Sequence, residues 1–344
     1  MTRPSRHSIA AGVLFVLLAV LPQLPLADLG IPANLLTELL ILSVLALGLN
    51  LILGTTGLLH LGIAAFYGIG CCIAGILTTS IFPFQTSFLV AAIVASAGTA
   101  LVGLVLGAPV LRLRGDYLAL VTLGFGQIVI TVLLEFENVT GGKKTLQGLF
   151  PPLLPFVTEG WLGRRGDWQV FPAFYYVCLG ILILVYVGLG NLERSRLGRG
   201  LVAVREDELA AGAMGLNPAR LKLAALAIGA GIAGLAGSLF AMHNTNTTEP
   251  QNSFNFNWSI IILAAVILGG LSSRAGVLWG VVLLMGFDKI VSRIIDDNLQ
   301  ASGLSGDSIF RLANWRLMIF GLVLIVMMRF RPHGLLPERR GASH

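Results

Sequence analysis

The chain has 344 residues, of which 56% are hydrophobic and only 12% are charged, and its mean hydropathy is +0.85. Soluble domains carry about a quarter charged residues, so this composition excludes an ordinary soluble enzyme and indicates a membrane protein. The net charge of +6 does not indicate nucleic-acid binding, because the basic residues lie in loops between apolar runs, as they do on the cytoplasmic side of membrane proteins.

Long apolar runs recur along the chain and predict an all-α polytopic membrane protein that forms one transmembrane domain over residues 1–344. The run near the N-terminus lacks a clear small-x-small cleavage site, so we expect an uncleaved first helix and not a signal peptide. About ten helices are expected, with both termini cytoplasmic because most Lys and Arg then lie inside. They cover about 9–21, 33–53, 58–80, 87–110, 117–134, 171–190, 223–242, two short helices in 258–286 that meet at an inside turn, and 315–330.

Small residues at a spacing of four mark two of these helices as tightly packed. The helix over 87–110 carries Gly103-x-x-x-Gly107. The helix over 223–242 carries three such pairs, Ala227/Gly231, Ala230/Gly234 and Ala233/Gly237. Small residues stabilise a membrane helix only by letting another helix approach closely, and a helix that faces lipid does not benefit from them. We therefore expect the helix over 223–242 to be enclosed by neighbouring helices.

A loop over about 135–170 is expected on the outer side, although its Lys143 and Lys144 run against the charge rule. It begins with Asn138-Val139-Thr140-Gly141-Gly142, just past the end of a helix. The backbone amides of a glycine pair can bind a carboxylate, but a plain turn explains the same residues. Asn138, Thr140, Gly141 and Gly142 are therefore candidates for the substrate path or for contact with a soluble partner.

The passage over about 194–222 is the longest charged and amphipathic stretch of the chain. Leu201, Val204, Leu209 and Ala213 fall near helical spacing, and Arg205 to Glu208 are expected to form a charged first turn. Gly215 and Pro218 are expected to end the helix, since glycine permits a left-handed cap and proline cannot continue the hydrogen-bond ladder. Such a helix is either a docking surface for a partner or a solvated connector, and both interpretations stay open from these residues alone.

Motifs of catalysis are missing from the sequence. Gly142-Lys143-Lys144-Thr145 lacks the glycine that a P-loop needs five positions before its lysine, and it follows no predicted strand. The histidines are isolated, and the three cysteines lie inside apolar runs, so neither a catalytic triad nor a metal site is predicted. Ionisable residues expected deep in the membrane are Glu38, Asp288 and Lys289, which makes them functional candidates, although the last two lie near a helix end, where snorkelling or local pairing is the better explanation.

Two short passages resemble one another, Ile52 to Gly57 and Ile267 to Ser272. Both are predicted as inner turns between helices rich in small residues. Transporters are often built from repeats with interrupted helices in corresponding positions, so an internal repeat is one explanation and chance is the other.

With these residues in hand, the chain resembles the M-type membrane permease subunit of bacterial ABC importers for branched-chain amino acids, to which urea importer permeases are closely related. The resemblance covers nearly the whole chain from about residue 35 onward. The passages that carry it are Arg112 to Gly124, Asn138 to Gly142, Ser195 to Gly215, Phe254 to Gly270 and Phe330 to Leu335.

The resemblance implies an ABC-importer permease architecture in which the helix around Glu208 is a cytoplasmic coupling helix. In the family a Glu-Ala-Ala…Gly motif docks on the ATPase, and here Glu208, Ala210, Ala211 and Gly215 match it with one extra residue, Leu209. Arg205 precedes the motif. The implied partners are a second homologous permease, two cytoplasmic ATP-binding subunits, an extracytoplasmic substrate-binding protein and the lipid membrane. ATP and Mg would be bound by the ATPases, so the chain is expected to be no enzyme and to hold no cofactor.

The expected function is therefore import of branched-chain or other neutral amino acids across the bacterial plasma membrane. The sequence departs from the family at Lys143-Lys144, where Pro/Thr-Asn-Gly is usual, and at Ser272, where the family prefers Gly. Three alternatives remain. They are a permease for urea or short-chain amides, a self-sufficient ion-coupled carrier, which the scarcity of buried acids disfavours, and a structural or receptor-like membrane protein, which the small-residue helices and the interrupted helix pair disfavour.

Overall fold

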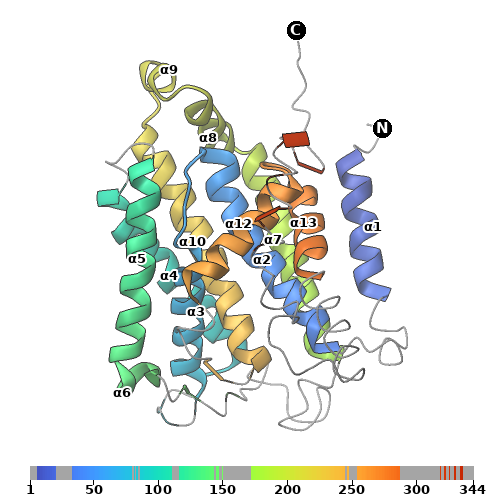
Figure 1. Cartoon of the computed structure of the whole chain (residues 1–344), viewed down its shortest axis with the longest axis vertical. Helices are drawn as coiled ribbons and strands as arrows, with labels where there is room; N and C mark the ends of the chain where they lie inside the picture. The colour runs from blue at the N-terminus through green and yellow to red at the C-terminus, as the bar shows by residue number, and fades with distance from the viewer. Residues whose placement is uncertain are drawn as a thin grey trace.

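The computed structural model describes residues 6–20, 33–79, 81, 83, 86–110, 116–142, 145–146, 149, 172–244, 246–247 and 254–286, and eight positions between 318 and 335. This part of the chain is almost entirely helical, which confirms the all-α class (Figure 1). The helices are α1 (Arg6–Val20), α2 (Ala33–Thr56), α3 (Ile63–Thr78), α4 (Phe88–Val110), α5 (Asp116–Glu135), α6 (Glu137–Thr140), α7 (Pro172–Arg194), α8 (Arg196–Glu206), α9 (Glu208–Ala213), α10 (Pro218–Asn244), α12 (Phe256–Gly269) and α13 (Arg274–Gly286).

Five of the described helices, α2, α4, α5, α7 and α10, are long and apolar enough to cross a membrane. Helices α3, α12 and α13 are apolar but shorter, and the 14 residues of α12 span only about 21 Å against a hydrocarbon core of about 30 Å. The chain is thus a multi-pass membrane protein. The expected total of about ten helices stays a prediction, because most of the last one, over 315–330, and most of the outer loop lie outside the described residues.

The apolar run over 258–286 forms two short helices, as the sequence predicts. Gly270 and Ser272 have φ values of +114° and +70°, which no helix accommodates, so the chain turns between α12 and α13. The two helices then pack closely, because a Cβ at Gly280 would overlap the Ala265 carbonyl oxygen. Leu335 returns to the same place, where its amide donates to the Leu268 carbonyl at 3.0 Å.

Helix α10 lies at the centre of the bundle and packs against α2, α3 and α4. Its glycines face these neighbours: a Cβ at Gly229 would lie 2.5 Å from the Ile52 side chain of α2, and one at Gly237 would overlap the Tyr67 carbonyl oxygen of α3. From α4, Ser96 donates a hydrogen bond to the Gly231 carbonyl at 2.9 Å. The enclosure predicted for this helix is therefore confirmed. The close packing predicted from Gly103 of α4 is confirmed as well, since a Cβ at Gly103 would lie 2.8 Å from the Ala230 Cβ of α10.

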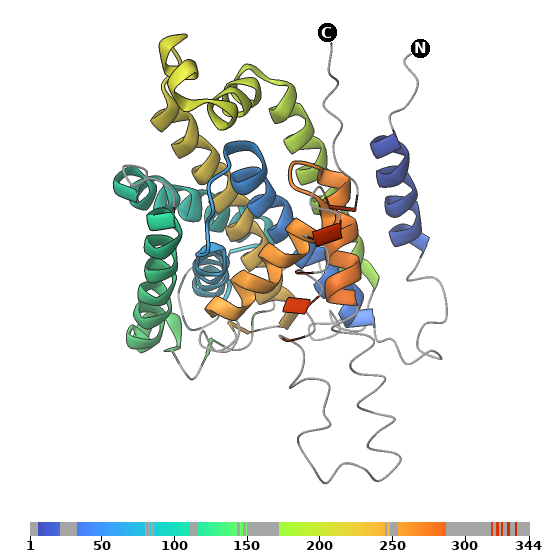
Figure 2. The same ribbon diagram turned by 45° about the horizontal axis from the view of Figure 1, so that its top comes forward.

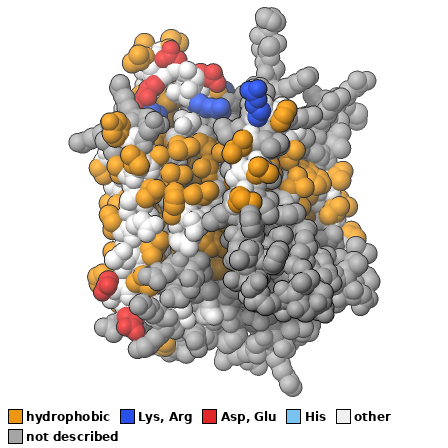
Figure 3. Space-filling view, in the orientation of Figure 1, with side chains coloured by type: hydrophobic (Ala, Val, Ile, Leu, Met, Phe, Trp, Pro, Cys, Tyr) orange, Lys and Arg blue, Asp and Glu red, His pale blue; other side chains and the backbone are white. Residues whose placement is uncertain are grey.

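The ends of the molecule differ in chemistry. Helices α8 and α9, the end of α2 and the turn between α12 and α13 share one end, whereas α6 lies at the opposite one (Figures 1 and 2). In the space-filling view, apolar side chains form a band across the middle, and the Lys and Arg side chains of the described residues that this face shows gather at the α8–α9 end (Figure 3). This arrangement fits a membrane-embedded band with its basic side at α8 and α9.

We expect Gly237→Ala to destabilise the protein, because its new methyl group would overlap backbone atoms of α3. Overpacking a closely packed site costs about 1–3 kcal/mol. The measurement is the midpoint of thermal unfolding in detergent. Gly180→Ala on α7 is the matched control, since nothing lies within 4 Å of its Cβ position, and it should leave the midpoint unchanged or slightly raised. Equal midpoints for the two variants would contradict this packing.

Candidate functional site

The charged passage forms two short helices at the basic end of the molecule, where the sequence predicted one. Ser195 caps α8, accepting a hydrogen bond from the Gly198 amide at 3.2 Å. Leu201 and Val204 are buried beneath α8, as their helical spacing predicted. The helix ends at Asp207, whose extended backbone (φ −152°, ψ 109°) interrupts the expected continuation.

Asp207 also begins α9, and its carboxylate is the reason for the break. Its Oδ1 accepts hydrogen bonds from the Leu209 amide at 2.9 Å and the Ala210 amide at 3.0 Å, which is the geometry of an N-terminal cap. Arg205 to Glu208 therefore do not form a single charged first turn. That prediction was wrong because the capping of α9 by Asp207 outweighs helix continuation.

The prediction that Gly215 ends the helix is confirmed, whereas the same prediction for Pro218 is wrong. Gly215 has a φ of +84°. Its amide donates to the Gly212 carbonyl at 3.0 Å and the Leu216 amide donates to the Ala211 carbonyl at 3.1 Å, the paired bonds of a glycine-terminated helix. Pro218 ends no helix but begins α10, at a first position where a missing amide hydrogen costs nothing.

Helix α9 protrudes from the bundle (Figure 1). Leu209 is 80% exposed and Met214 is 84% exposed, whereas Ala211 is buried against the protein. At the base, Lys222 of α10 forms an ion pair with Glu208 at 2.7 Å. Two large exposed apolar side chains at a charged end of the molecule, away from the apolar band, are typical of a protein contact surface.

Arg205 joins α8 to two turns that lie far apart in the sequence. Its Nη1 donates to the Gly54 carbonyl at the end of α2, at 2.5 Å, and to the Ser272 hydroxyl in the turn between α12 and α13, at 2.6 Å. The Ser272 hydroxyl donates in turn to the Gly54 carbonyl at 2.6 Å, and the Ser272 amide donates to Asn50 Oδ1 at 3.1 Å. We call this cluster of Asn50, Gly54, Arg205 and Ser272 the inner latch.

The inner latch brings together the two passages whose sequences resemble one another, around Gly54 and around Ser272. Ser272 is also the position where the resemblance implies a glycine, and its hydroxyl takes part in two of the latch bonds. The contact between the two turns is a finding, whereas the internal repeat stays a prediction.

A second basic residue anchors the same end of the bundle. Arg274, the first residue of α13, forms an ion pair with Glu193 of α7 at 3.0 Å and donates to the Tyr186 carbonyl at 2.8 Å. Its guanidinium carbon also lies 4.8 Å from the centre of the Tyr186 ring. The turn predicted at Arg274 is therefore fixed to both α7 and, through Ser272, α8.

The candidate residues at the opposite end form a local turn. Thr140 donates to the Leu133 carbonyl at 2.5 Å, and the Gly142 amide donates to the Thr140 hydroxyl at 3.3 Å. The Gly141 amide donates to the Glu137 carbonyl at 3.0 Å. Both amides of the glycine pair are therefore engaged locally, which favours the plain-turn interpretation over carboxylate binding. A role for this segment, Asn138 included, in the substrate path stays a prediction.

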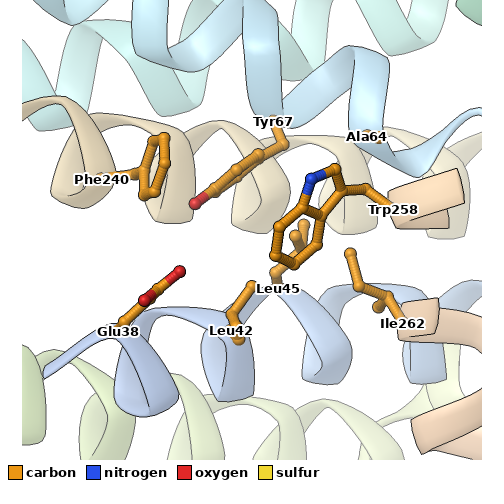
Figure 4. Close-up of a pocket in the computed structure, with 8 residues that line it drawn as sticks. All are labelled: Glu38, Leu42, Leu45, Ala64, Tyr67, Phe240, Trp258 and Ile262. Carbon is orange, nitrogen blue, oxygen red and sulfur yellow. The ribbon is translucent and has the colours of Figure 1, made fainter. Parts of the chain in front are cut away.

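Of the three ionisable residues expected in the membrane, the structure describes Glu38, and the other two lie outside the described residues. Glu38 lines a small cavity of about 10 Å³, room for about one water molecule, between α2, α3, α10 and α12 (Figure 4). The other lining residues are Leu42, Leu45, Ala64, Tyr67, Phe240, Trp258 and Ile262. Sequence reasoning missed the aromatic members, because each looks like an ordinary core residue in an apolar run.

The residue types that bind metal ions are spread apart in the part of the chain that the structure describes. No group of three or more His, Cys, Asp or Glu side chains comes together there. Cys71, Cys72 and Cys178 are buried and free, in agreement with the interpretation of these residues as small packed side chains.

Comparison with known proteins was made over the whole chain. Residues 31–328 match the family described as branched-chain amino acid transport system / permease component. No solved structure matches the chain.

Three curated relatives illustrate the similarity. The chain is 36% identical over 319 residues to the high-affinity branched-chain amino acid transport system permease protein LivM of Escherichia coli, covering 88% of this chain and 69% of the relative. It is 37% identical to the protein of the same name from Salmonella typhimurium, with the same coverage. A protein of Methanocaldococcus jannaschii, described as a probable branched-chain amino acid transport permease protein LivM, is 27% identical over 79% of this chain and 70% of its own length. The chain therefore belongs to the family of permease components of branched-chain amino acid transport systems.

Proposed function

We propose that this chain is the permease subunit of an ATP-driven importer that moves branched-chain amino acids across the plasma membrane. The family match and the LivM relatives favour these substrates over urea. We further propose that the chain works with a second permease, two cytoplasmic ATP-binding subunits and an extracytoplasmic substrate-binding protein. ATP and Mg are then bound by the ATPases, and the chain itself performs no hydrolysis.

The observation that carries the coupling proposal is the exposed apolar tip of α9 together with the bonds that hold it to the bundle. Leu209 and Met214 leave most of their apolar surface exposed to solvent. Burying this surface in an apolar groove of the ATPase would stabilise the contact, so the two side chains suit such a groove. Motion of the tip passes directly into α10, since Asn217 caps that helix immediately after the turn at Gly215. The role of the motif residues in this proposal is to form the α9 helix and the turn that ends it, and these residues are Glu208, Ala210, Ala211 and Gly215.

A second route for the motion of the tip leads from α8 through the inner latch to α2 and to the turn between α12 and α13. Arg205 links the tip region to α2 and to the turn between α12 and α13. A rigid-body shift of α8 and α9 when the ATPases close would therefore pull on both interrupted segments together. Alternating exposure of the path to the two sides of the membrane would follow from this shift.

The first test is purification of the chain from its native membrane in a mild detergent, followed by identification of the co-purifying proteins and an ATPase assay. Recovery of a second permease and of nucleotide-binding subunits in constant proportion is expected. Leucine uptake by the purified chain alone in liposomes without ATP would contradict the proposal and favour an ion-coupled carrier. Uptake of urea without uptake of leucine by the whole complex would favour the urea permease.

We expect the double variant Leu209→Glu/Met214→Glu to insert normally but to lose the ATP-binding subunits. Two buried carboxylates in an apolar groove would be unpaired, which costs several kcal/mol at an interface. Co-purification of the ATPases measures the effect. The volume-conserving exchange Leu209→Met/Met214→Leu is the control and should retain them. Normal recovery of the ATPases with the double Glu variant would exclude the tip as the docking surface.

We expect Arg205→Ala to retain the ATP-binding subunits but to lower leucine uptake by the whole complex about tenfold, because hydrogen bonds to charged groups contribute about 1.5–3 kcal/mol. Arg199→Ala is the matched control: Arg199 lies on the same helix, and its Nη1 donates only to the nearby Arg194 carbonyl at 2.6 Å among the bonds that the structure describes. If the two variants transport leucine equally well, the inner latch plays no part in coupling.

A further inference from the structure

Helix α5 stands at the edge of the bundle and leaves one side uncovered (Figures 1 and 2). Leu120, Gln127, Ile128 and Thr131 are exposed on this side, and nothing lies within 4 Å of the Cβ position of Gly124. The five positions fall at helical spacing, so they form one strip along the helix. We call this strip the α5 face.

Gln127 places an amide side chain in the middle of the α5 face. The 20 residues of α5 span about 30 Å, the thickness of the hydrocarbon core, and Gln127 lies near the midpoint of that length. Its backbone carbonyl accepts a hydrogen bond from the Thr131 hydroxyl at 3.0 Å, but its side-chain amide has no partner within the described part of the chain. An amide without a hydrogen-bond partner is costly in hydrocarbon, so lipid tails do not suit this position.

Helix α4 shows how this chain builds a side that faces lipid. Every exposed side chain that the structure describes on α4 is apolar, and Ile93, Leu101 and Val105 are examples. The α5 face differs because it carries an amide, a hydroxyl and a glycine, which are residue types that membrane proteins place between helices. The difference indicates that protein, and not lipid, covers the α5 face.

Gly124 gives the α5 face a shape that suits another helix. The glycines of α10 are required inside this chain, since a Cβ at Gly229 or Gly237 would collide with a neighbouring helix. A Cβ at Gly124 would collide with nothing. A glycine beside an exposed amide lets the backbone of a second helix approach closely enough for a hydrogen bond across the contact.

A small cavity beside Gln127 does not satisfy its amide. The cavity has a volume of about 10 Å³, room for about one water molecule, and Gly62 and Ser259 also line it. An amide has two donor hydrogens and two acceptor lone pairs, so one water satisfies it only in part. The same region joins α5 to the non-helical segment before α3, because the Leu61 amide donates to Thr122 Oγ1 at 3.2 Å. A contact on the α5 face is therefore one residue layer from an interrupted part of the bundle.

We propose that the α5 face packs against a membrane-spanning helix of the second permease, which supplies a polar group that hydrogen-bonds the Gln127 amide. The inference rests on the proposed function and deepens it by naming the surface that joins the two permeases. Of the proposed partners, the ATP-binding subunits and the substrate-binding protein lie in water on the two sides of the membrane, so neither reaches the middle of α5. The second permease is the partner that shares the membrane with this chain.

The first test is photo-cross-linking of the whole importer in its native membrane. A photoreactive benzoylphenylalanine takes the place of Ile128, which is 64% exposed on the α5 face, or of Ile93, which is 67% exposed on α4 and serves as the matched control. We expect irradiation to join the Ile128 position to the second permease and the Ile93 position to lipid alone. Equal yields at the two positions, or a cross-link from Ile128 to another part of the same chain, would overturn the proposal.

The second test measures how much of the second permease co-purifies with variants of this chain in a mild detergent. Gly124→Leu should lose it, because the new side chain fills the space for the partner helix, whereas Gly180→Leu on α7 introduces the same bulk at another open glycine and should retain it. Gln127→Leu should lower the recovery about threefold, since it removes a hydrogen bond between helices. The thermal midpoint of the chain by itself should stay unchanged or rise with Gln127→Leu. Equal recovery with the two glycine variants would exclude the α5 face as the interface.

A water-filled path along α5 is the other explanation for a polar face, and cysteine labelling separates it from a helix contact. The native Cys71, Cys72 and Cys178 are buried, so the background is low. In the assembled importer, Thr131→Cys should resist a water-soluble maleimide, whereas Glu137→Cys, at an exposed position beyond the end of α5, should react. Equal labelling of the two cysteines would overturn the proposal in favour of the path. If the unmodified chain recovers no second permease, the proposed function itself fails, and the inference fails with it.

Discussion

The close approach of α10 to three neighbouring helices is the constraint on which the rest of the structure depends. Lipid tails are as apolar as leucine, so helices in a membrane associate through tight packing and not through the hydrophobic effect. Glycines at 229, 234 and 237 let the α10 backbone touch side chains and carbonyl groups of α2, α3 and α4, where any side chain would intrude. Such close packing leaves α10 little room to shift relative to these neighbours.

This rigidity connects the two ends of the molecule. Helix α10 begins directly after the α9 tip and ends near the cavity that Phe240 lines. Helix α2 runs between the same two places, with Gly54 in the inner latch and Glu38 in the cavity wall. A displacement applied at the tip therefore has two continuous helices along which to reach the cavity, and such a path of packed elements is what mechanical coupling requires.

Under the proposed function, the interrupted segments are the parts of this bundle that would move. The turn between α12 and α13 is closed by Ser272 and Arg205 through hydrogen bonds to a single carbonyl, that of Gly54. The two Arg205 bonds are only partly buried, so they are easier to rearrange than the glycine contacts in the centre of the bundle. The molecule thus combines a rigid centre with a latch at the basic end, where the partner subunits would act.

The sequence by itself determined the membrane class, the approximate helix positions, the split of 258–286 into two short helices and the central place of α10, because hydrophobic run length and glycine spacing are local properties. It also singled out Arg205, Glu38 and the helix-ending glycine at 215. Only the tertiary structure decided that Arg205 bonds to Gly54 and Ser272. It also showed that the amides of Gly141 and Gly142 already donate hydrogen bonds within their own turn. The grouping of Tyr67, Phe240 and Trp258 with Glu38 around one cavity likewise came from the structure alone. These contacts join residues up to about 220 positions apart, and no local pattern encodes which side chains meet when four separate helices pack together.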